Sequence, residues 1–382
     1  MAKWVDNPNP KHTSFPAHGS ATVTALLLWN QNIITASDDS SIHVYSTEGE
    51  LVRSLQGHEG GIWALALHGD TLVSGGTDGS TRIWDLQTSN CTHVFRRHAG
   101  TVRCVVIAEP EESGTGESWP KQPIIVTGSR DHTLCGWVLP RPEDAGYTDD
   151  DSDDVSTSNP YHRFQLHGHE DSIRSISARG RKAASASYDR TVRIWDIVAG
   201  QCLFVLRGHT DKGWLLQLHE SSSMSLLLIL LQVYNVIIDA GRDQVYSGSM
   251  DRTVRVWDLS SGVCKHTLSR HGSLVGVLSA SPSFLVSGAA EGLVCVWDPQ
   301  SGDLVKTFEH KYAITAIQHD DTKIISGSDG LVRVLDITNG KEQVLLSDER
   351  TRVVSCLALA SQLCVAVTKQ NTSSVDVWSF EE

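Results

Sequence analysis

The chain has 382 residues, 40% of them hydrophobic, and it carries a formal net charge of −13 at pH 7. The hydrophobic share is large enough for a substantial core, and a chain of this length would usually contain two or three domains. No apolar run is long enough to cross a bilayer and no signal peptide is recognisable, so we expect neither a membrane protein nor a secreted one.

A repeat with a period of about 40 residues runs along the chain. Each unit has an early histidine, then an apolar strand pattern, a Ser/Thr-Gly segment and an acidic turn residue, and it ends in Trp-Asp or a relic of it. The histidines are His18, His58, His98, His169, His209, His271 and His310. The Trp-Asp pairs begin at Trp84, Trp195, Trp257 and Trp297, and the degenerate ends begin at Tyr45, Trp137, Leu335 and Trp378.

This pattern is typical of WD repeats, in which each unit supplies four strands of a β-propeller blade. The pattern recurs about eight times in register, so the repeats account for the whole chain as one domain. We therefore predict an all-β fold, an eight-bladed WD-repeat β-propeller over residues 11–382, after an N-terminal tail over residues 1–10.

The two ends of the chain are expected to close the ring. Residues 11–15 stand where the other units have a short outer strand, and the last unit stops at Trp378, a third-strand position. If these two segments pair, the last sheet is completed and two open sheet edges disappear.

The third unit is lengthened by two insertions, at residues 109–121 and 140–160. The first holds four Glu and one Lys, and the second holds seven acids and one Arg, so together they account for most of the net negative charge. The second insertion has a composition that does not fold alone. We interpret both as charged surface loops on one face of the propeller, with a docking site as the alternative.

The fifth unit contains a third insertion, at residues 213–232, which includes the run LLLILL. Deleting it restores the usual spacing between His209 and the next inner strand. We interpret this segment as foreign to the fold, such as an untranslated segment left in the gene model. A real segment of this kind would be an exposed aggregation hazard, or a hydrophobic docking arm.

The repeated histidines are expected to be structural. Each stands at fixed offsets from a Ser or Thr, an acid and an aromatic residue, and a hydrogen-bonded tetrad would satisfy all of these buried polar groups. The expected tetrads are His58, Ser74, Asp78 and Trp84; His169, Ser185, Asp189 and Trp195; and His209, Ser247, Asp251 and Trp257.

Several classes of function are not indicated. The sequence has no nucleophile elbow, no phosphate-cradling glycine loop and no cluster of metal ligands. We therefore expect no enzyme, no catalytic residue, no cofactor and no bound metal, and no nucleic-acid or membrane partner. Cys91, Cys202 and Cys264 share one repeat position, which suits packing in a reducing compartment, so we expect the nucleus or the cytoplasm.

Binding is expected on the face formed by the loop before each first strand and the turn between the second and third strands. One position per unit follows the opening apolar residue of the first strand: Thr24, Trp63, Arg103, Arg174, Tyr234, Gly276, Thr315 and Ser355. The other position precedes the turn acid: Asp38, Thr77, Arg130, Tyr188, Met250, Ala290 and Ser328.

Three arginines, Arg103, Arg130 and Arg174, fall at these positions in neighbouring units. Guanidinium groups offer paired donors and a permanent charge, which a dianionic phosphate requires. Aromatic and hydroxyl side chains flank them: Trp63, Thr77, Thr101, Tyr188 and Tyr234. The pattern indicates a phosphate site, with solvated surface arginines as the alternative.

The units resemble, in order, the propeller of the F-box/WD-repeat substrate receptors of SCF ubiquitin ligases. The resemblance covers residues 11–382 apart from the three insertions. It rests on GGIW from Gly60, SGGTD from Ser74, TVRC from Thr101, GSRD from Gly128, SIRS from Ser172, SASYD from Ser185 and VYNV from Val233. It implies that Arg103, Arg130 and Arg174 bind the phosphothreonine of a degron. It also implies that a groove for the peptide's apolar and proline residues is lined by Trp63, Thr77, Tyr188 and Tyr234.

The partners implied by the resemblance are phosphorylated protein substrates with a phosphothreonine-proline degron, which the ligase marks for ubiquitin-dependent degradation. Residues 1–10 are too few for an F-box, so we expect the SCF core as a partner only if a longer chain supplies one. The alternative function is a general WD-repeat interaction scaffold without phosphate dependence. Convergence of the three arginines would distinguish the two.

Overall fold

The computed structural model of the chain describes residues 10–112, 116–149, 159–209, 233–239, 241–328, 331–347, 353–359, 363–369 and 372–380. These residues form β-strands joined by turns and loops, and no helix among them is long and apolar enough to cross a membrane. The expected insertion at 213–232 lies outside the described residues.

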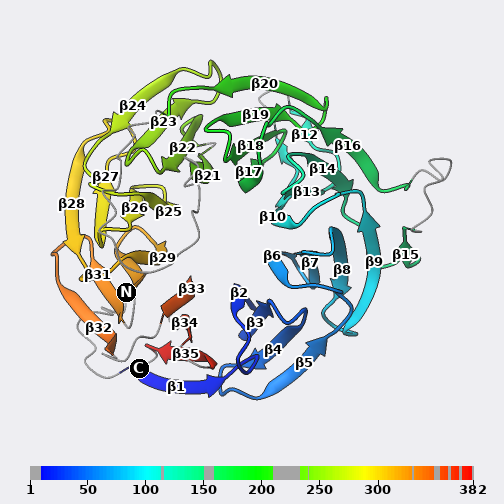
Figure 1. Cartoon of the computed structure of the whole chain (residues 1–382), viewed down its shortest axis with the longest axis horizontal. Helices are drawn as coiled ribbons and strands as arrows, with labels where there is room; N and C mark the ends of the chain where they lie inside the picture. Colours follow the sequence, from blue (N-terminus) through cyan, green and yellow to red (C-terminus); the bar gives the residue numbers. More distant parts are fainter. Residues whose placement is uncertain are drawn as a thin grey trace, which may run out of the picture.

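The described strands form eight radial sheets, numbered 1 to 8 here, and one separate two-stranded sheet. In each radial sheet the strands lie side by side, with the first at the centre of the ring and the last at its outer edge (Figure 1). Sheets 1 to 4 contain, from the centre outward, β2 (Val23–Trp29), β3 (Asn32–Ser37), β4 (Ile42–Ser46) and β5 (Leu51–Leu55); β6 (Ile62–His68), β7 (Thr71–Gly76), β8 (Ser80–Asp85) and β9 (Asn90–Arg96); β10 (Val102–Ala108), β13 (Ile124–Ser129), β14 (Leu134–Val138) and β16 (His162–Leu166); and β17 (Ile173–Arg179), β18 (Lys182–Ser187), β19 (Val192–Asp196) and β20 (Gln201–Leu206). Sheets 5 to 8 contain β21 (Val233–Asp239), β22 (Gln244–Ser249), β23 (Val254–Asp258) and β24 (Cys264–Leu268); β25 (Val275–Ala280), β26 (Leu285–Ala289), β27 (Leu293–Trp297) and β28 (Leu304–Glu309); β29 (Ile314–His319), β30 (Lys323–Ser328), β31 (Leu331–Asp336) and β32 (Glu342–Ser347); and β33 (Val353–Leu359), β34 (Leu363–Lys369), β35 (Ser373–Ser379) and β1 (Lys11–Pro16).

The ring is closed at both its centre and its edge. Each innermost strand packs beside that of the next sheet, from β2 around to β33 and back to β2. At the edge, β1 pairs antiparallel with β35, and the imidazole of His12 stacks on Trp378 and lies 3.1 Å from a carboxylate oxygen of Asp376. The predicted pairing of residues 11–15 beside the strand that ends near Trp378 is confirmed (Figure 1).

The core lies between the sheets, because both faces of each sheet are covered by a neighbour. Between sheets 3 and 4, for example, Val126 and Phe164 pack in one cluster with Ile173 and Trp195. The sequence of a strand that is buried on both faces is a continuous run of apolar or small residues. This explains segments such as Ile124–Ser129, in which every residue is buried.

Seven sheets share a hydrogen-bond network around the early histidine. In sheet 2, His58 bonds Asp78 (2.8 Å) and Ser74 (2.7 Å), and the indole of Trp84 donates to the Ser74 hydroxyl (2.8 Å). The same arrangement joins His169, Ser185, Asp189 and Trp195, and His209, Ser247, Asp251 and Trp257. The histidines of sheets 1, 3, 6 and 7 bond at least a Ser or Thr of their second strand.

Sheet 8 does not have this network in its described residues. Trp378 is buried there, but no histidine precedes β33 at the repeat position. The predicted number of eight WD-repeat blades is therefore wrong, and seven sheets are of the WD type. The sequence count took Trp378 as the marker of an eighth repeat, although the histidine that links three strands is missing from it.

Parts of the two acidic insertions pack against neighbouring sheets. β11 (Glu111–Glu112) and β12 (Ser118–Trp119) form the separate hairpin, and Glu111 is bonded to Arg179 of sheet 4 at 3.0 Å. β15 (Tyr147–Thr148) pairs parallel with the outer strand β9. These described parts are thus structured additions to the propeller rather than free loops.

Candidate functional site

Every innermost strand has a β-bulge close to its start. In β10, Val102 pairs with Ser129 and Cys104 pairs with Gly128, so that Arg103 has no partner across the sheet. A bulge bends the strand and changes the direction in which its extra side chain points. The bulged residues are Thr24, Trp63, Arg103, Arg174, Tyr234, Gly276, Thr315 and Ser355, which are the eight positions that the repeat pattern assigned to the binding face.

The bulged residues divide the ring into two halves. In sheets 1, 7 and 8, the hydroxyls of Thr24, Thr315 and Ser355 donate to backbone carbonyls of the adjacent second strand, and sheet 6 has Gly276. In sheets 2 to 5 the bulged residues are long: Trp63, Arg103, Arg174 and Tyr234. The side chains available to a ligand therefore lie on one half of the ring.

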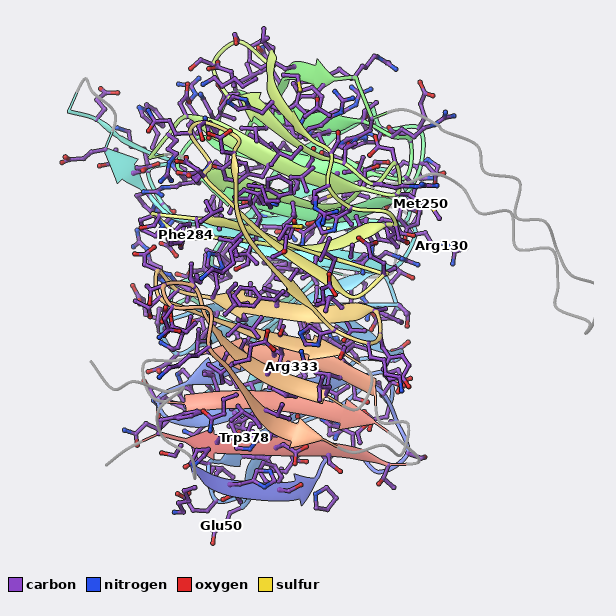
Figure 2. The ribbon with its side chains drawn as sticks, turned by 90° about the vertical axis from the view of Figure 1, so that its left-hand side faces the viewer. Glu50, Arg130, Met250, Phe284, Arg333 and Trp378 are labelled. Carbon is purple, nitrogen blue, oxygen red and sulfur yellow. The ribbon has the colours of Figure 1, made fainter. Side chains whose placement is uncertain are left out.

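Arg130 lies on the turn between β13 and β14, at the same end of the sheet as the bulge. Its backbone N–H donates to the carbonyl of Thr101 (2.9 Å), and its own carbonyl accepts from the hydroxyl of Ser172 (3.4 Å). The turn is thereby tied to the loops that lead into both β10 and β17. Figure 2 shows Arg130 and Met250, which hold equivalent repeat positions, on one face, and Phe284 on the other.

Arg103, Tyr188 and Tyr234 form a continuous cluster across sheets 3, 4 and 5. A terminal nitrogen of Arg103 donates to the Tyr188 hydroxyl at 3.4 Å, and the guanidinium carbon lies 6.0 Å from the centre of that ring. The rings of Tyr188 and Tyr234 are tilted by 52°, with centroids 6.1 Å apart. One guanidinium and two aromatic rings from three neighbouring sheets are therefore connected by successive contacts.

The electrostatics of this cluster are positive. No described carboxylate pairs with Arg103, Arg130 or Arg174, and the Nε atom of Arg103 is buried without a hydrogen-bond partner. Burial raises the pKa of the Cys104 thiol to about 12, although Arg174 and Arg103 both act in the opposite direction. Burial and the neighbouring Tyr188 likewise raise the pKa of Tyr234, against the charge of Arg174.

The remaining predicted residues are less closely connected. Trp63 is 48% exposed, and Thr77 is exposed on the β7–β8 turn, where its N–H donates to the carbonyl of Gly61 at 2.8 Å. Among the described residues, no side-chain bond joins Trp63 or Thr77 to the arginines. They lie on the adjoining sheet 2, whose inner strand β6 packs beside β10.

Ser172 is a site residue that the sequence reasoning did not single out. Its hydroxyl contacts the Arg130 carbonyl, and its own carbonyl accepts the N–H of Tyr188 at 3.0 Å. It lies within the SIRS motif, two residues before Arg174, so its proximity to the arginines was readable from the repeat. The described residues contain no group of three or more His, Cys, Asp or Glu placed to hold a metal.

The sequence profile described as "WD40: WD domain, G-beta repeat" matches seven segments: residues 9–46, 49–85, 89–137, 160–196, 200–258, 262–298 and 302–336. The seven matches agree with the seven sheets that have the histidine network. Residues 337–382, which supply three strands of sheet 8, lie outside the matches.

The chain is also similar to curated proteins. It is 32% identical over 422 aligned positions to Cell division control protein 4 of Saccharomyces cerevisiae, covering 100% of this chain and 49% of that protein. It is 37% identical over 361 positions to Cell division control protein 4 of Candida albicans, covering 91% and 49%. The chain thus spans about half the length of these relatives.

Among solved structures, the crystal structure of the computationally designed Ika8 protein superimposes with a TM-score of 0.72, covering 95% of this chain and 98% of that one. The two sequences are 24% identical, so the similarity concerns the fold alone.

Proposed function

Because this chain belongs to the WD domain, G-beta repeat family, we propose that it binds other proteins, and that its ligands are phosphorylated peptide segments. The single observation that carries the proposal is the set of three arginines on two adjacent sheets, none of which has a described carboxylate partner. A phosphorylated side chain carries a charge of about −1.5 to −2 at pH 7 and three strong acceptor oxygens. It would supply the counter-charge that the site lacks.

The number of cationic side chains favours a phosphate over a carboxylate ligand, because a phosphorylated side chain carries more charge and more acceptor oxygens than a carboxylate. Arg103 and Arg174 lie on neighbouring inner strands, and Arg130 lies on the turn between β13 and β14. We propose that their guanidinium groups converge on one ligand, since three sets of paired donors suit a tetrahedral dianion with several oxygens.

We propose phosphothreonine followed by proline as the ligand motif. Tyr188 and Tyr234 present two tilted aromatic rings beside Arg103, and a proline ring packs well on such a surface. Trp63, on the other side of Arg103, offers an exposed indole for an apolar residue elsewhere in the peptide. The peptide would cross the half of the ring that carries the long bulged side chains.

We further propose that the chain acts as the substrate-binding part of an SCF-type ubiquitin ligase. The support is the order of the motifs that resemble F-box/WD-repeat receptors, together with the similarity to the two Cell division control 4 proteins. The SCF core would be a partner through an F-box in the same protein. The competing function is a WD scaffold that binds proteins without regard to phosphorylation.

The proposal is tested by fluorescence anisotropy with a labelled peptide that contains one Thr-Pro, with and without phosphate on the threonine. Each arginine contributes one or two charge-assisted bonds, worth about 1.5–3 kcal/mol apiece. Arg103→Ala, Arg130→Ala and Arg174→Ala should therefore each weaken binding of the phosphorylated peptide by about tenfold or more.

The matched control is Arg97→Ala, which removes an exposed arginine from the loop before β10, where its guanidinium bonds Gln165 rather than the site. This variant should bind the phosphorylated peptide with the parent affinity. Equal affinity of the parent for both peptides, or unchanged binding by Arg130→Ala, would contradict phosphate recognition and favour the scaffold.

A further inference from the structure

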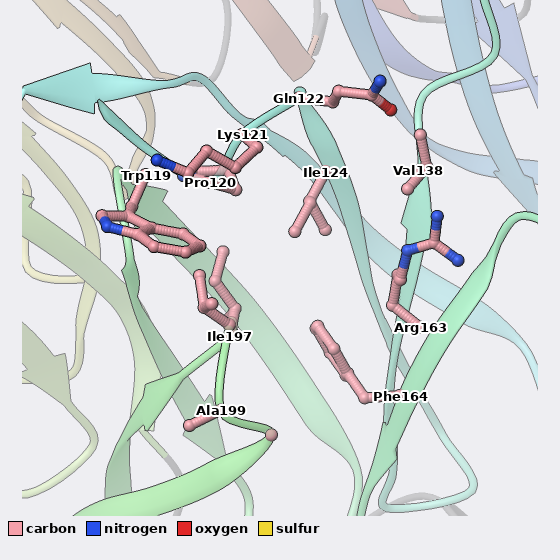
Figure 3. A pocket seen from close by; sticks show the side chains of 12 residues that line it. Trp119, Pro120, Lys121, Gln122, Ile124, Val138, Arg163, Phe164, Ile197 and Ala199 are labelled. Atoms are coloured by element: carbon pink, nitrogen blue, oxygen red, sulfur yellow. The ribbon is translucent and has the colours of Figure 1, made fainter. Parts of the chain in front are cut away.

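A second concave site lies on the face opposite the arginines, between sheets 3 and 4. It is formed by the loop after β12, by the start of β16 and by the turn between β19 and β20. These connections lie at the ends of the strands away from the β13–β14 turn that holds Arg130. The cavity has a volume of about 460 Å³, and Figure 3 shows the side chains around it.

The walls of this cleft are apolar. Trp119 and Pro120 form one side, Ile124 and Ile197 lie at the base, and Phe164 closes the other side (Figure 3). Ile124, Phe164 and Ile197 are at least nine-tenths buried, so these side chains are held by the core. The wall formed by Trp119 and Pro120 belongs to the insertion at 109–121.

The rim of the cleft is positively charged. Among the described residues that line it, Lys121 and Arg163 are cationic and none is Asp or Glu. The ammonium of Lys121 lies 4.2 Å from the centre of the Trp119 ring and 4.0 Å from a carboxylate oxygen of Glu117. Arg163 donates to the carbonyls of Pro160 and His162 and has no carboxylate partner among the described residues.

Lys121 is available to an anionic ligand. An exposed ion pair such as Lys121–Glu117 contributes at most about 1 kcal/mol, so another anion can replace Glu117.

The volume of the cleft lies within the range of ligand-binding pockets, roughly 300–1,000 Å³. Because Lys121, Gln122, Arg163 and Ala199 are exposed, the cleft is open to solvent. It can receive one or two side chains of a bound segment rather than enclose a free small molecule.

We propose that this cleft docks a short peptide segment of a partner protein, in which a large apolar side chain stands beside one or two carboxylates. The apolar side chain fills the space between Trp119, Ile197 and Phe164, and the carboxylates bind Lys121 and Arg163. This site is separate from the phosphopeptide face, so a partner here and a phosphorylated ligand can be bound at the same time. The inference does not depend on the proposed phosphate recognition.

The test selects a phage-displayed library of random heptapeptides on the whole chain and on the variant Ala199→Trp. Ala199 lines the cleft with an exposed side chain on the β19–β20 turn, so an indole there fills the cavity without disturbing the core. Peptides enriched on the parent should carry Leu, Phe or Trp within two positions of Asp or Glu, and they should fail to bind Ala199→Trp.

Charge variants test the binding of the carboxylates separately from the binding of the apolar side chain. For synthetic copies of the enriched peptides, Arg163→Glu should weaken binding by about tenfold or more, while Arg163→Lys, which keeps the charge, should retain most of it. Both variants and Ala199→Trp should keep the parent's denaturation midpoint. The proposal is overturned if no peptide is enriched on the parent relative to Ala199→Trp, or if the enriched peptides bind Arg163→Glu as well as the parent.

Discussion

At the scale of single residues, the buried polar groups of the repeat show how each sheet holds its loop and its turn together. Asp189 illustrates the point, since it accepts bonds from His169 (2.7 Å), from the hydroxyl of Thr191 (2.7 Å) and from two backbone N–H groups. Burial alone would raise the pKa of this carboxyl, but the bond with His169 and those from Thr191 and Glu170 hold the pKa well below its usual range. The charged Asp189 carboxylate therefore connects the loop before β17 to the turn between β18 and β19.

Asp189→Ala should accordingly destabilise the propeller. The substitution leaves the buried His169 and two backbone donors without an acceptor, which we expect to lower the free energy of unfolding by about 1–3 kcal/mol. Urea denaturation of the parent and the variant measures this difference. Glu170→Ala, which removes an adjacent exposed carboxylate and keeps the backbone N–H that Asp189 accepts, is the control. An unchanged midpoint for Asp189→Ala would mean that the network has no part in stability.

His310 should make stability depend on pH. It bonds the hydroxyls of Ser326 and Ser328, and burial, assisted by the charge of Arg333, lowers its pKa from 6.5 to about 4. Below pH 6.5 the unfolded chain therefore binds a proton that the folded chain excludes. The contribution of His310 to the free energy of unfolding is full above pH 6.5 and is lost as the pH falls towards 4, by about 1–3 kcal/mol.

The measurement is the urea midpoint at a series of pH values between 7 and 4. Other histidines also titrate in this range, so the parent is compared with His310→Asn, whose stability should fall less steeply over the same interval. Parallel curves for the two proteins would show that His310 is not the group responsible.

At the scale of elements, the β-bulge explains why one repeat position carries the candidate binding side chains. The repeat period allowed the bulged positions to be predicted, because every unit opens with an apolar residue followed by a variable one. The bulge itself was not predictable, since a two-residue alternation does not reveal an extra unpaired residue. The bond from Arg103 to Tyr188 was not predictable from the sequence either, because the two residues are 85 positions apart.

The insertions show a different limit of sequence reasoning. Their acidic composition indicated charged surface loops, but composition does not say what a loop packs against. In the structure, Glu111 of β11 is bonded to Arg179, and β12 supplies Trp119 to a cleft. The WD-type count was likewise too high by one, because Trp378 has the aromatic residue of the pattern without the histidine that makes a blade of this type.

At the scale of the whole molecule, the ring gives the chain two independent faces. One face carries three arginines without described carboxylate partners, in a protein whose net charge is −13. That contrast favours an anionic ligand at this place on the face. The long bulged side chains occupy sheets 2 to 5 only, so a peptide on this face should lie across half of the ring.

The central claim is that the arginines recognise the phosphate itself. A double-mutant cycle tests this most directly, with Arg103→Ala as one change and loss of the threonine phosphate as the other. Binding of the Thr-Pro peptide is measured by anisotropy for all four combinations. The cycle cancels effects of the substitution that do not involve the phosphate, such as loss of the bond to Tyr188, so we expect the remaining coupling energy to be about 1.5–3 kcal/mol. A coupling energy of zero, with Arg103→Ala weakening both peptides equally or neither, would contradict the account.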